Sequence, residues 1–92
     1  MRIVLTEHFQ RDVRHLTSTE RDRVFEAVLA IPRAVGDVHT HAGLGMRKVH
    51  KSGIWEVRIG LNLRIIFALA DGFLTFVRLG THDDVKRFLR EL

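Results

Sequence analysis

The chain has 92 residues, of which 46% are hydrophobic and 28% charged, with no cysteine and one proline. This composition excludes a disordered tail, a disulfide scaffold and a thiolate metal site, and the length predicts a single domain over residues 1–92. No apolar run is long enough to span a bilayer, and the first residues lack the apolar core of a signal peptide. We therefore expect a cytoplasmic protein without membrane contact.

The positive charge lies in the second half of the chain. Residues 1–45 contain six basic and six acidic side chains, whereas residues 46–92 contain nine basic and five acidic ones. Twelve of the fifteen basic residues are arginine, whose planar guanidinium binds a phosphate at two points. The surplus indicates a surface for a polyanion, with binding that weakens as salt rises. A solvated basic surface that only aids solubility is the alternative.

The first part of the chain predicts one strand and two helices. Residues 3–5 form a short apolar strand, and a helix of about ten residues follows, marked by apolar side chains at helical spacing. These side chains are Phe9, Val13 and Leu16. Thr17 and Glu20 fit a capping box at the start of a second helix. Pro32 is expected to end that helix because proline has no N–H to donate. The short connection predicts a helical hairpin.

After a loop over residues 33–45, the apolar period changes to two, which is typical of β-strands. Alternating side chains over residues 55–59 and 62–69 predict two strands, and residues 73–80 form the next one after a hairpin turn at Asp71-Gly72. Trp55 shares a strand face with other apolar side chains, which favours a core position over a base-stacking one.

A final helix follows the last strand. Thr81 is its predicted N-cap, with Asp84 three residues on. The buried stripe is expected to consist of Val85, Phe88, Leu89 and Leu92. His82 then lies in the first turn, where free N–H groups favour an anion and the Thr81 backbone could also meet a phosphate. The element order predicts an α+β fold, with an N-terminal strand and helical hairpin packed on a mostly antiparallel, twisted sheet and a C-terminal helix.

The register of the sheet decides where its arginines lie. A tight turn places Arg58 opposite Arg64, and a three-residue turn centred on Asp71 places Arg78 opposite Arg64 as well. A two-residue turn would instead pair Arg78 with Ile65 and push a charge into the core. Because an unpaired buried guanidinium is strongly destabilising, we favour the register that gathers all three arginines on one face, where an anion can sit among them.

These residues resemble a known family, the RelE/ParE toxin superfamily. The resemblance rests on the element order, on the segment SGIWEVRIGLNLRIIF at residues 52–67, and on Gly80-Thr81-His82. It covers essentially the whole chain and is nearest the RelE, YoeB and YafQ branches, whose members are ribosome-dependent mRNA endonucleases held inactive by a cognate antitoxin. The resemblance implies a RelE-like microbial RNase fold and a cytoplasmic type II toxin that inhibits translation. A homodimer and a toxin–antitoxin hetero-oligomer are both open.

Carried over by position, the resemblance implies a catalytic site. Arg64 corresponds to the strand arginine that holds the scissile phosphate, Arg58 to a further basic residue of the site, and His82 to a catalytic histidine or arginine. A ribose 2′-hydroxyl would attack the neighbouring phosphate while His82 moves a proton and the arginines stabilise the phosphorane. Neither metal nor cofactor is needed. The alternative for both arginines is a rim position in salt bridges with Glu56.

Further basic residues flank this site. Contacts to RNA are expected from Arg47, Lys48, His50, Lys51 and Arg78. Three of these, Arg47, Lys48 and Lys51, would serve an acidic antitoxin equally well. The His39-x-His41 spacing could suggest a metal, but without a third ligand surface histidines are favoured.

The chain departs from the family pattern at two places. It has no tyrosine, and Phe88 falls near the position of the family's C-terminal tyrosine. The YoeB-type glutamate base would fall near Gly45 or Met46, where no carboxylate is present. Either a histidine substitutes, with His39, His41 and His50 as candidates, or the protein binds without cutting efficiently. A ParE-like toxin that inhibits DNA gyrase and a silenced paralogue that still binds an antitoxin are the alternatives.

Overall fold

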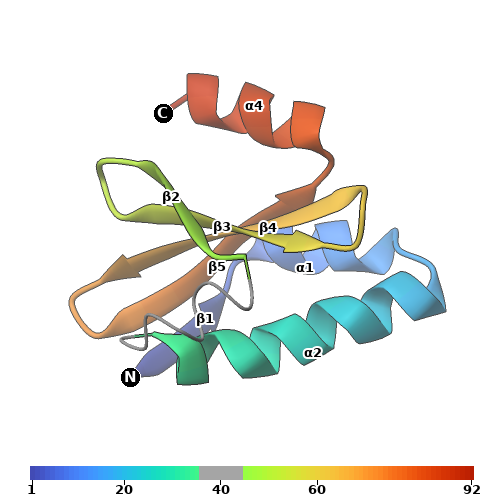
Figure 1. Cartoon of the computed structure of the whole chain (residues 1–92), viewed down its shortest axis with the longest axis horizontal. Helices are drawn as coiled ribbons and strands as arrows, with labels where there is room; N and C mark the ends of the chain where they lie inside the picture. Colours follow the sequence, from blue (N-terminus) through green and yellow to red (C-terminus); the bar gives the residue numbers. More distant parts are fainter. Residues whose placement is uncertain (36–44) are drawn as a thin grey trace.

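A mixed five-stranded sheet, with strand order β1-β5-β4-β3-β2, organises the computed structural model (Figure 1). The structure describes residues 1–35 and 45–92. Its elements are β1 (Arg2–Leu5), α1 (Glu7–Arg14), α2 (Ser18–Ala34), β2 (Arg47–His50), β3 (Ile54–Ile59), β4 (Leu63–Ala70), β5 (Phe73–Gly80) and α4 (His82–Arg90). β1 pairs with β5 in parallel, and the other neighbouring strands are antiparallel. The predicted α+β class is confirmed.

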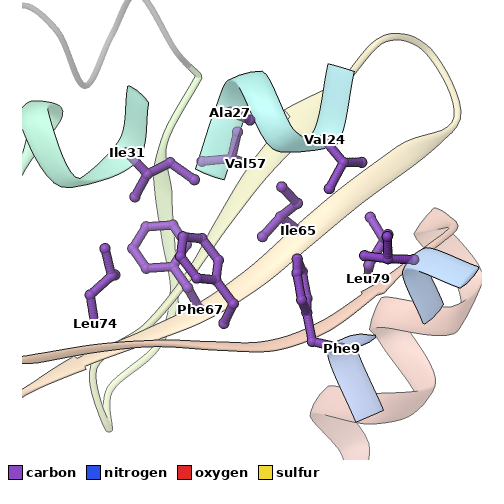
Figure 2. Packing of buried hydrophobic residues seen from close by; sticks show 11 residues of the cluster. Phe9, Val24, Ala27, Ile31, Val57, Ile65, Phe67, Leu74 and Leu79 are labelled. Atoms are coloured by element: carbon purple, nitrogen blue, oxygen red, sulfur yellow. The ribbon is translucent and has the colours of Figure 1, made fainter. Parts of the chain in front are cut away.

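The helices lie on both faces of the sheet. α1 and α2 run below it, and α4 crosses above it (Figure 1). The main core lies between the sheet and the first two helices, where side chains from α1 and α2 meet those of β3, β4 and β5 (Figure 2). Its largest fully buried members are Phe9, Val24, Ile31, Val57, Ile65, Phe67, Leu74 and Phe76. Trp55 is half-buried against this cluster, as expected of a core residue.

The helix boundaries largely follow the capping residues. Thr17 and Glu20 form the predicted capping box, in which the Glu20 N–H donates to Thr17 Oγ1 and the Glu20 carboxylate accepts from the Thr17 N–H. Pro32 does not end α2, which continues to Ala34. The expected stop was wrong because one missing N–H near a helix end removes a single bond. The Ile31 carbonyl still accepts from the Val35 N–H at 3.2 Å, and packing of Ile31 and Ala34, both fully buried, holds the last turn in place.

The β3–β4 hairpin has the predicted register, since Arg58 pairs with Arg64. The β4–β5 hairpin does not have the predicted register. Asp71 and Gly72 have φ of 51° and 77° and form a two-residue turn, the type favoured in hairpins. The predicted three-residue turn, and the pairing of Arg78 with Arg64, are wrong.

A β-bulge at Val77 decides the sheet face on which Arg78 lies. Phe67 pairs with Phe76 and Ile66 with Arg78, so Val77 has no partner on β4. One extra residue shifts the alternation of side chains by one. Arg78 therefore returns to the face of Arg64, and Arg64 itself pairs with Gly80. The arginines share one face, as predicted, for a different reason.

α4 packs through Val85, which is buried, and through Phe88 and Leu89, which are half-buried. Leu92 lies beyond the helix end and is exposed, so it is not part of the expected stripe. None of the helices in the part of the chain that the structure describes has the length and apolar character needed to cross a membrane.

Candidate active site

Two arginines and a glycine form a row across three strands. Arg58 on β3 lies opposite Arg64 on β4, which lies opposite Gly80 at the end of β5. Residues directly opposite one another in an antiparallel sheet point to the same face. A Cβ built on Gly80 would lie 2.7 Å from Asp84 Cβ, so this face is the one that α4 approaches. Arg58 is exposed, whereas only 12% of the Arg64 side chain is accessible.

Glu56 lies on the same face, beside this row. It is the only charged residue that is buried within residues 1–35 and 45–92, with 4% of its surface exposed. Its Oε1 accepts hydrogen bonds from Arg64 Nη1 at 3.0 Å and from Arg47 Nη2 at 3.3 Å. Arg64 therefore makes the ion pair that was considered as an alternative to a site role. Arg58, which extends into solvent, has no such contact with Glu56 among the ion pairs of the described residues.

His82 opens α4, two residues after Gly80, and is exposed. The turn that carries it is fixed by a capping box, in which the Asp84 N–H donates to Thr81 Oγ1 at 3.2 Å and the Thr81 N–H donates to Asp84 Oδ2 at 2.9 Å. These bonds lower the pKa of Asp84. The Thr81 N–H, which was predicted to be able to meet a phosphate, donates to Asp84 in this structure.

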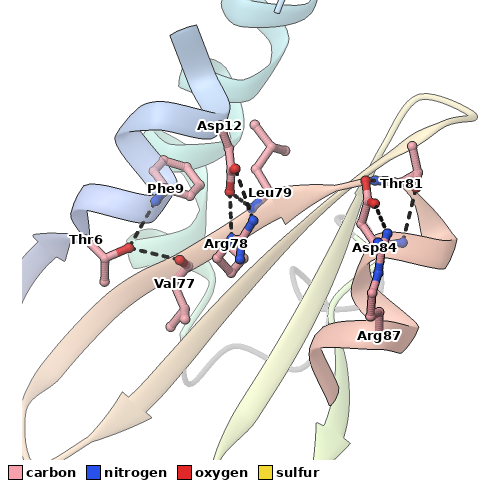
Figure 3. A network of polar contacts seen from close by, with 9 residues as sticks. All are labelled: Thr6, Phe9, Asp12, Val77, Arg78, Leu79, Thr81, Asp84 and Arg87. Atoms are coloured by element: carbon pink, nitrogen blue, oxygen red, sulfur yellow. Dashed lines mark hydrogen bonds and ion pairs between the residues drawn. The ribbon is translucent and has the colours of Figure 1, made fainter. Parts of the chain in front are cut away.

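Arg78 is bonded to Asp12 of α1 (Figure 3). Its Nε and Nη2 donate to the Asp12 carboxylate at 3.0 and 3.3 Å, and the Leu79 N–H donates to the same carboxylate at 2.9 Å. The hydrogen bond with Asp12 raises the pKa of Arg78. Sequence reasoning missed Asp12, although an acidic residue beside the apolar stripe of Phe9 and Val13 was a signal for it.

The remaining basic residues predicted to contact RNA lie on and after the edge strand β2. Lys48 and Lys51 are exposed, and 68% of the Arg47 side chain is accessible. His50 is half-buried, and its Nδ1 accepts from the Ser52 N–H at 3.2 Å. Its neutral form therefore carries the ring proton on Nε2. The structure thus bonds Arg47 and Arg64 to Glu56 and places Arg58 opposite Arg64. Arg78, on the same sheet face, is bonded to Asp12 of α1 instead.

Comparison with known proteins rests on structure, since no family model and no curated protein matches the sequence. The toxin–antitoxin complex DinJ-YafQ from E. coli matches with a TM-score of 0.72 at 17% identity, over 90% of this chain and 93% of that one. The archaeal RelE-RelB complex from Pyrococcus horikoshii OT3 matches with a TM-score of 0.67 at 14% identity, over 87% and 92%. The YoeB/ParE toxin from Agrobacterium tumefaciens matches with a TM-score of 0.67 at 19% identity, over 89% and 99%.

This chain has the RelE-like toxin fold. The resemblance expected from the sequence is confirmed at the level of the fold, over most of both chains. The identities of 14 to 19% in these three matches leave the chemistry to be argued from this chain's own residues.

In this RelE-like fold, the place expected for a tyrosine lies beside a polar cleft. Phe88 lines a cleft of about 220 Å³ between β5 and α4, together with Arg78, Asp84, Arg87 and Glu91. The place expected for a glutamate base is occupied by Gly45, which is exposed, and by Met46, which packs against the core. His39 and His41 lie outside the described residues. Residues 1–35 and 45–92 hold no group of three or more histidine or carboxylate side chains placed to bind a metal ion.

Proposed function

We propose that residues 1–92 form a type II toxin that cleaves mRNA in the decoding site of the ribosome, without a metal, and thereby inhibits translation. The observation that carries the proposal is the pairing of Arg58 with Arg64, and of Arg64 with Gly80. It sets two arginine residues side by side on one sheet face, at the end where β5 passes into the helix that begins with His82.

This arrangement suits transfer of a phosphoryl group to a ribose 2′-hydroxyl. The attacking oxygen forms a bond to phosphorus while the bond to the 5′-oxygen breaks, which leaves a 2′,3′-cyclic phosphate and a 5′-hydroxyl. The negative charge that grows on the phosphorane is stabilised by Arg64 and Arg58. His82 moves a proton to or from the reacting oxygens, and its exposed position lets substrate reach it.

The further basic residues of β2 and the following turn would guide the RNA. Arg47, Lys48 and His50 lie on the edge strand β2, and Lys51 follows it directly. Exposed cations along one edge attract a phosphate backbone. Arg78 would contribute to the field near the site, since its side chain is 38% exposed while it binds Asp12.

The proposed partner is a cognate antitoxin. DinJ-YafQ and RelB-RelE, which share this fold, are toxin–antitoxin complexes. This chain carries exposed apolar side chains that a protein partner could cover, on β1 and on the outer face of α2. They include Ile3, Leu5, Phe25 and Leu29. Co-expression with the product of the adjacent reading frame, followed by purification of the pair, tests this part of the proposal.

Primer extension on mRNA after induced expression tests the nuclease. The wild type should create new 5′ ends, and Arg58→Ala, Arg64→Ala and His82→Ala should each lower cleavage about a hundredfold. Arg58→Ala is the sharpest variant because the side chain is exposed and its loss should leave the fold intact. Arg11→Ala, an exposed arginine of α1 on the opposite side of the sheet, is the matched control.

A second function is favoured by one observation. Arg64 is largely buried and held by Glu56, which fits a paralogue that binds an antitoxin and cleaves weakly. Intact mRNA with retained antitoxin binding would support that function. Intact mRNA with arrested DNA replication would instead support a ParE-like gyrase inhibitor.

A further inference from the structure

We propose that Glu56 is a positioning residue, which holds the Arg64 guanidinium in the orientation that receives the scissile phosphate. This inference rests on the proposed nuclease function and adds a residue to it. The evidence is the place of Glu56 in the sheet, its burial, and the bonds that it makes to two arginines on either side.

Glu56 lies at the centre of three strands. It pairs with Arg47 on β2 and with Ile66 on β4, and Arg64 lies two residues before Ile66 on the same face. The carboxylate therefore reaches Arg47, which lies directly opposite on β2, and Arg64, which lies diagonally opposite on β4. Both guanidiniums donate to the same oxygen, Oε1. Since the strand backbones fix these positions, the carboxylate is a rigid anchor for the longer arginine side chains.

Burial fixes the orientation of the Glu56 and Arg64 side chains relative to each other. The two side chains are 5% and 12% exposed, so neither can exchange its partner freely for water. A buried carboxylate needs hydrogen-bonded positive partners, and charge-assisted bonds are shorter and stronger than neutral ones. A guanidinium has five N–H donors, and the bond from Nη1 to Glu56 uses one of them. The others keep a fixed direction that a phosphate can use.

The charges around Glu56 also favour this role. Arg58 and Arg64 are directly opposite each other, and two like charges at that spacing repel. The negative charge of Glu56 offsets part of this repulsion. Glu56 together with Arg47, Arg58 and Arg64 still carries a net positive charge of two. An anion is still attracted, while each arginine keeps a defined place.

Glu56 does not take the place of the missing glutamate base. A general base must come within hydrogen-bond reach of the proton that it removes. Glu56 is 4% exposed, and two guanidiniums occupy its Oε1. Its effect on the reaction therefore passes through Arg64.

The test separates cleavage from RNA binding. Glu56→Gln keeps the shape of the side chain and removes its charge, and Glu7→Gln on the exposed surface of α1 makes the same charge change away from the site. Ribosomes programmed with an mRNA that carries 2′-deoxyribose in the decoding site report binding, and the unmodified mRNA reports single-turnover cleavage. Glu56→Gln should cleave about tenfold to a hundredfold more slowly. It should bind at least as tightly as the wild type, because one negative charge is gone.

A purely structural role predicts something different. Loss of folded protein would weaken binding and cleavage by the same factor, and this outcome would overturn the proposal, as would wild-type cleavage by folded Glu56→Gln. Faster cleavage would also overturn it, since Glu56 would then compete with the phosphate for Arg64. Glu56→Asp, which keeps the charge and shortens the side chain, should fold and yet cleave more slowly than the wild type. Circular dichroism establishes that each variant is folded.

A readout without RNA keeps the inference separate from the nuclease proposal. In nitrogen-edited NMR spectra of the arginine side chains, the Arg64 Nη protons should exchange slowly with water in the wild type and in Glu7→Gln. They should exchange about tenfold faster in Glu56→Gln, since a neutral acceptor holds them less strongly. If the wild type does not cleave but shows this difference, the nuclease proposal fails and Glu56 still positions Arg64. Unchanged exchange in Glu56→Gln contradicts the positioning role itself.

Discussion

Asp12 binds Arg78 across 66 positions of the sequence, with its two carboxylate oxygens accepting from Nε and Nη2 at 3.0 and 3.3 Å. The same carboxylate accepts from the Leu79 N–H, next to the β-bulge at Val77. Asp12 therefore joins α1 to the last residues of β5, at the point where that strand becomes irregular.

Replacement of Asp12 should destabilise the protein. Asp12→Ala leaves the Leu79 N–H without its acceptor and Arg78 without its partner, and we expect a loss of about 2–3 kcal/mol in the free energy of unfolding. Asp12→Asn keeps one neutral acceptor and should lose less. Urea denaturation measures both, with Glu7→Ala as the control because its exposed ion pair with Arg11 is worth at most about 1 kcal/mol. Equal stability of Asp12→Ala and Glu7→Ala would contradict this role.

Gly80 permits the close approach of α4 to β5. A Cβ at this position would lie 2.7 Å from Asp84 Cβ and 2.9 Å from Asp84 Oδ2, so Gly80→Ala must displace the helix start or break its cap. We expect about 1–3 kcal/mol of destabilisation and, because His82 begins this helix, slower cleavage as well. Thermal unfolding and primer extension give the two readouts. Lys86→Ala, an exposed substitution in the same helix, should leave the melting temperature nearly unchanged.

The Thr81–Asp84 capping box makes stability depend on pH. Hydrogen bonds from the Thr81 N–H and hydroxyl lower the pKa of Asp84 in the folded state. The stabilisation is therefore complete above the pKa of the unfolded chain, about 4, and is lost as pH falls through the lower folded value. Asp84→Asn should be less stable than the wild type at neutral pH, by about 1 kcal/mol or less, and the difference should shrink below about pH 4.

Denaturation titrations at several pH values measure this difference. Asp83→Asn, which changes an exposed carboxylate in the same turn, serves as the comparison. A gap between wild type and Asp84→Asn that stays constant down to about pH 2 would show that the carboxylate's charge has no part in the cap.

Lys48 and Lys51 should set the salt dependence of RNA binding. Both are exposed at the β2 edge. The double variant Lys48→Gln/Lys51→Gln should reduce the slope of log K against log salt by about 0.7 for each phosphate that is no longer neutralised by a lysine. Fluorescence anisotropy with a single-stranded RNA measures the slope. Arg11→Gln/Arg14→Gln removes the same charge from exposed positions of α1 and should leave the slope unchanged if binding is confined to the β2 edge.

Local signals in the sequence determined the elements and one of the two hairpin registers. Thr17 with Glu20 and Thr81 with Asp84 marked helix starts correctly, because a capping box is built within four residues. The alternation of apolar residues in β3 and β4 placed Arg58 opposite Arg64, since a tight hairpin leaves few registers that bury one face. The element order, the segment at residues 52–67 and Gly80-Thr81-His82 were enough to indicate the RelE-like fold, and the phosphate-binding face stays a prediction.

Only the tertiary structure decided what each arginine contacts. The bulge at Val77 has no strong local signature, and Asp12 meets Arg78 because α1 packs across β5 rather than because of any short-range pattern. In the same way, Glu56 is an ordinary outward-facing strand residue in the sequence, and it becomes a buried anchor because β2 and β4 flank it with arginines. Contacts between residues far apart in the chain depend on how whole elements pack, and sequence spacing carries little of that information.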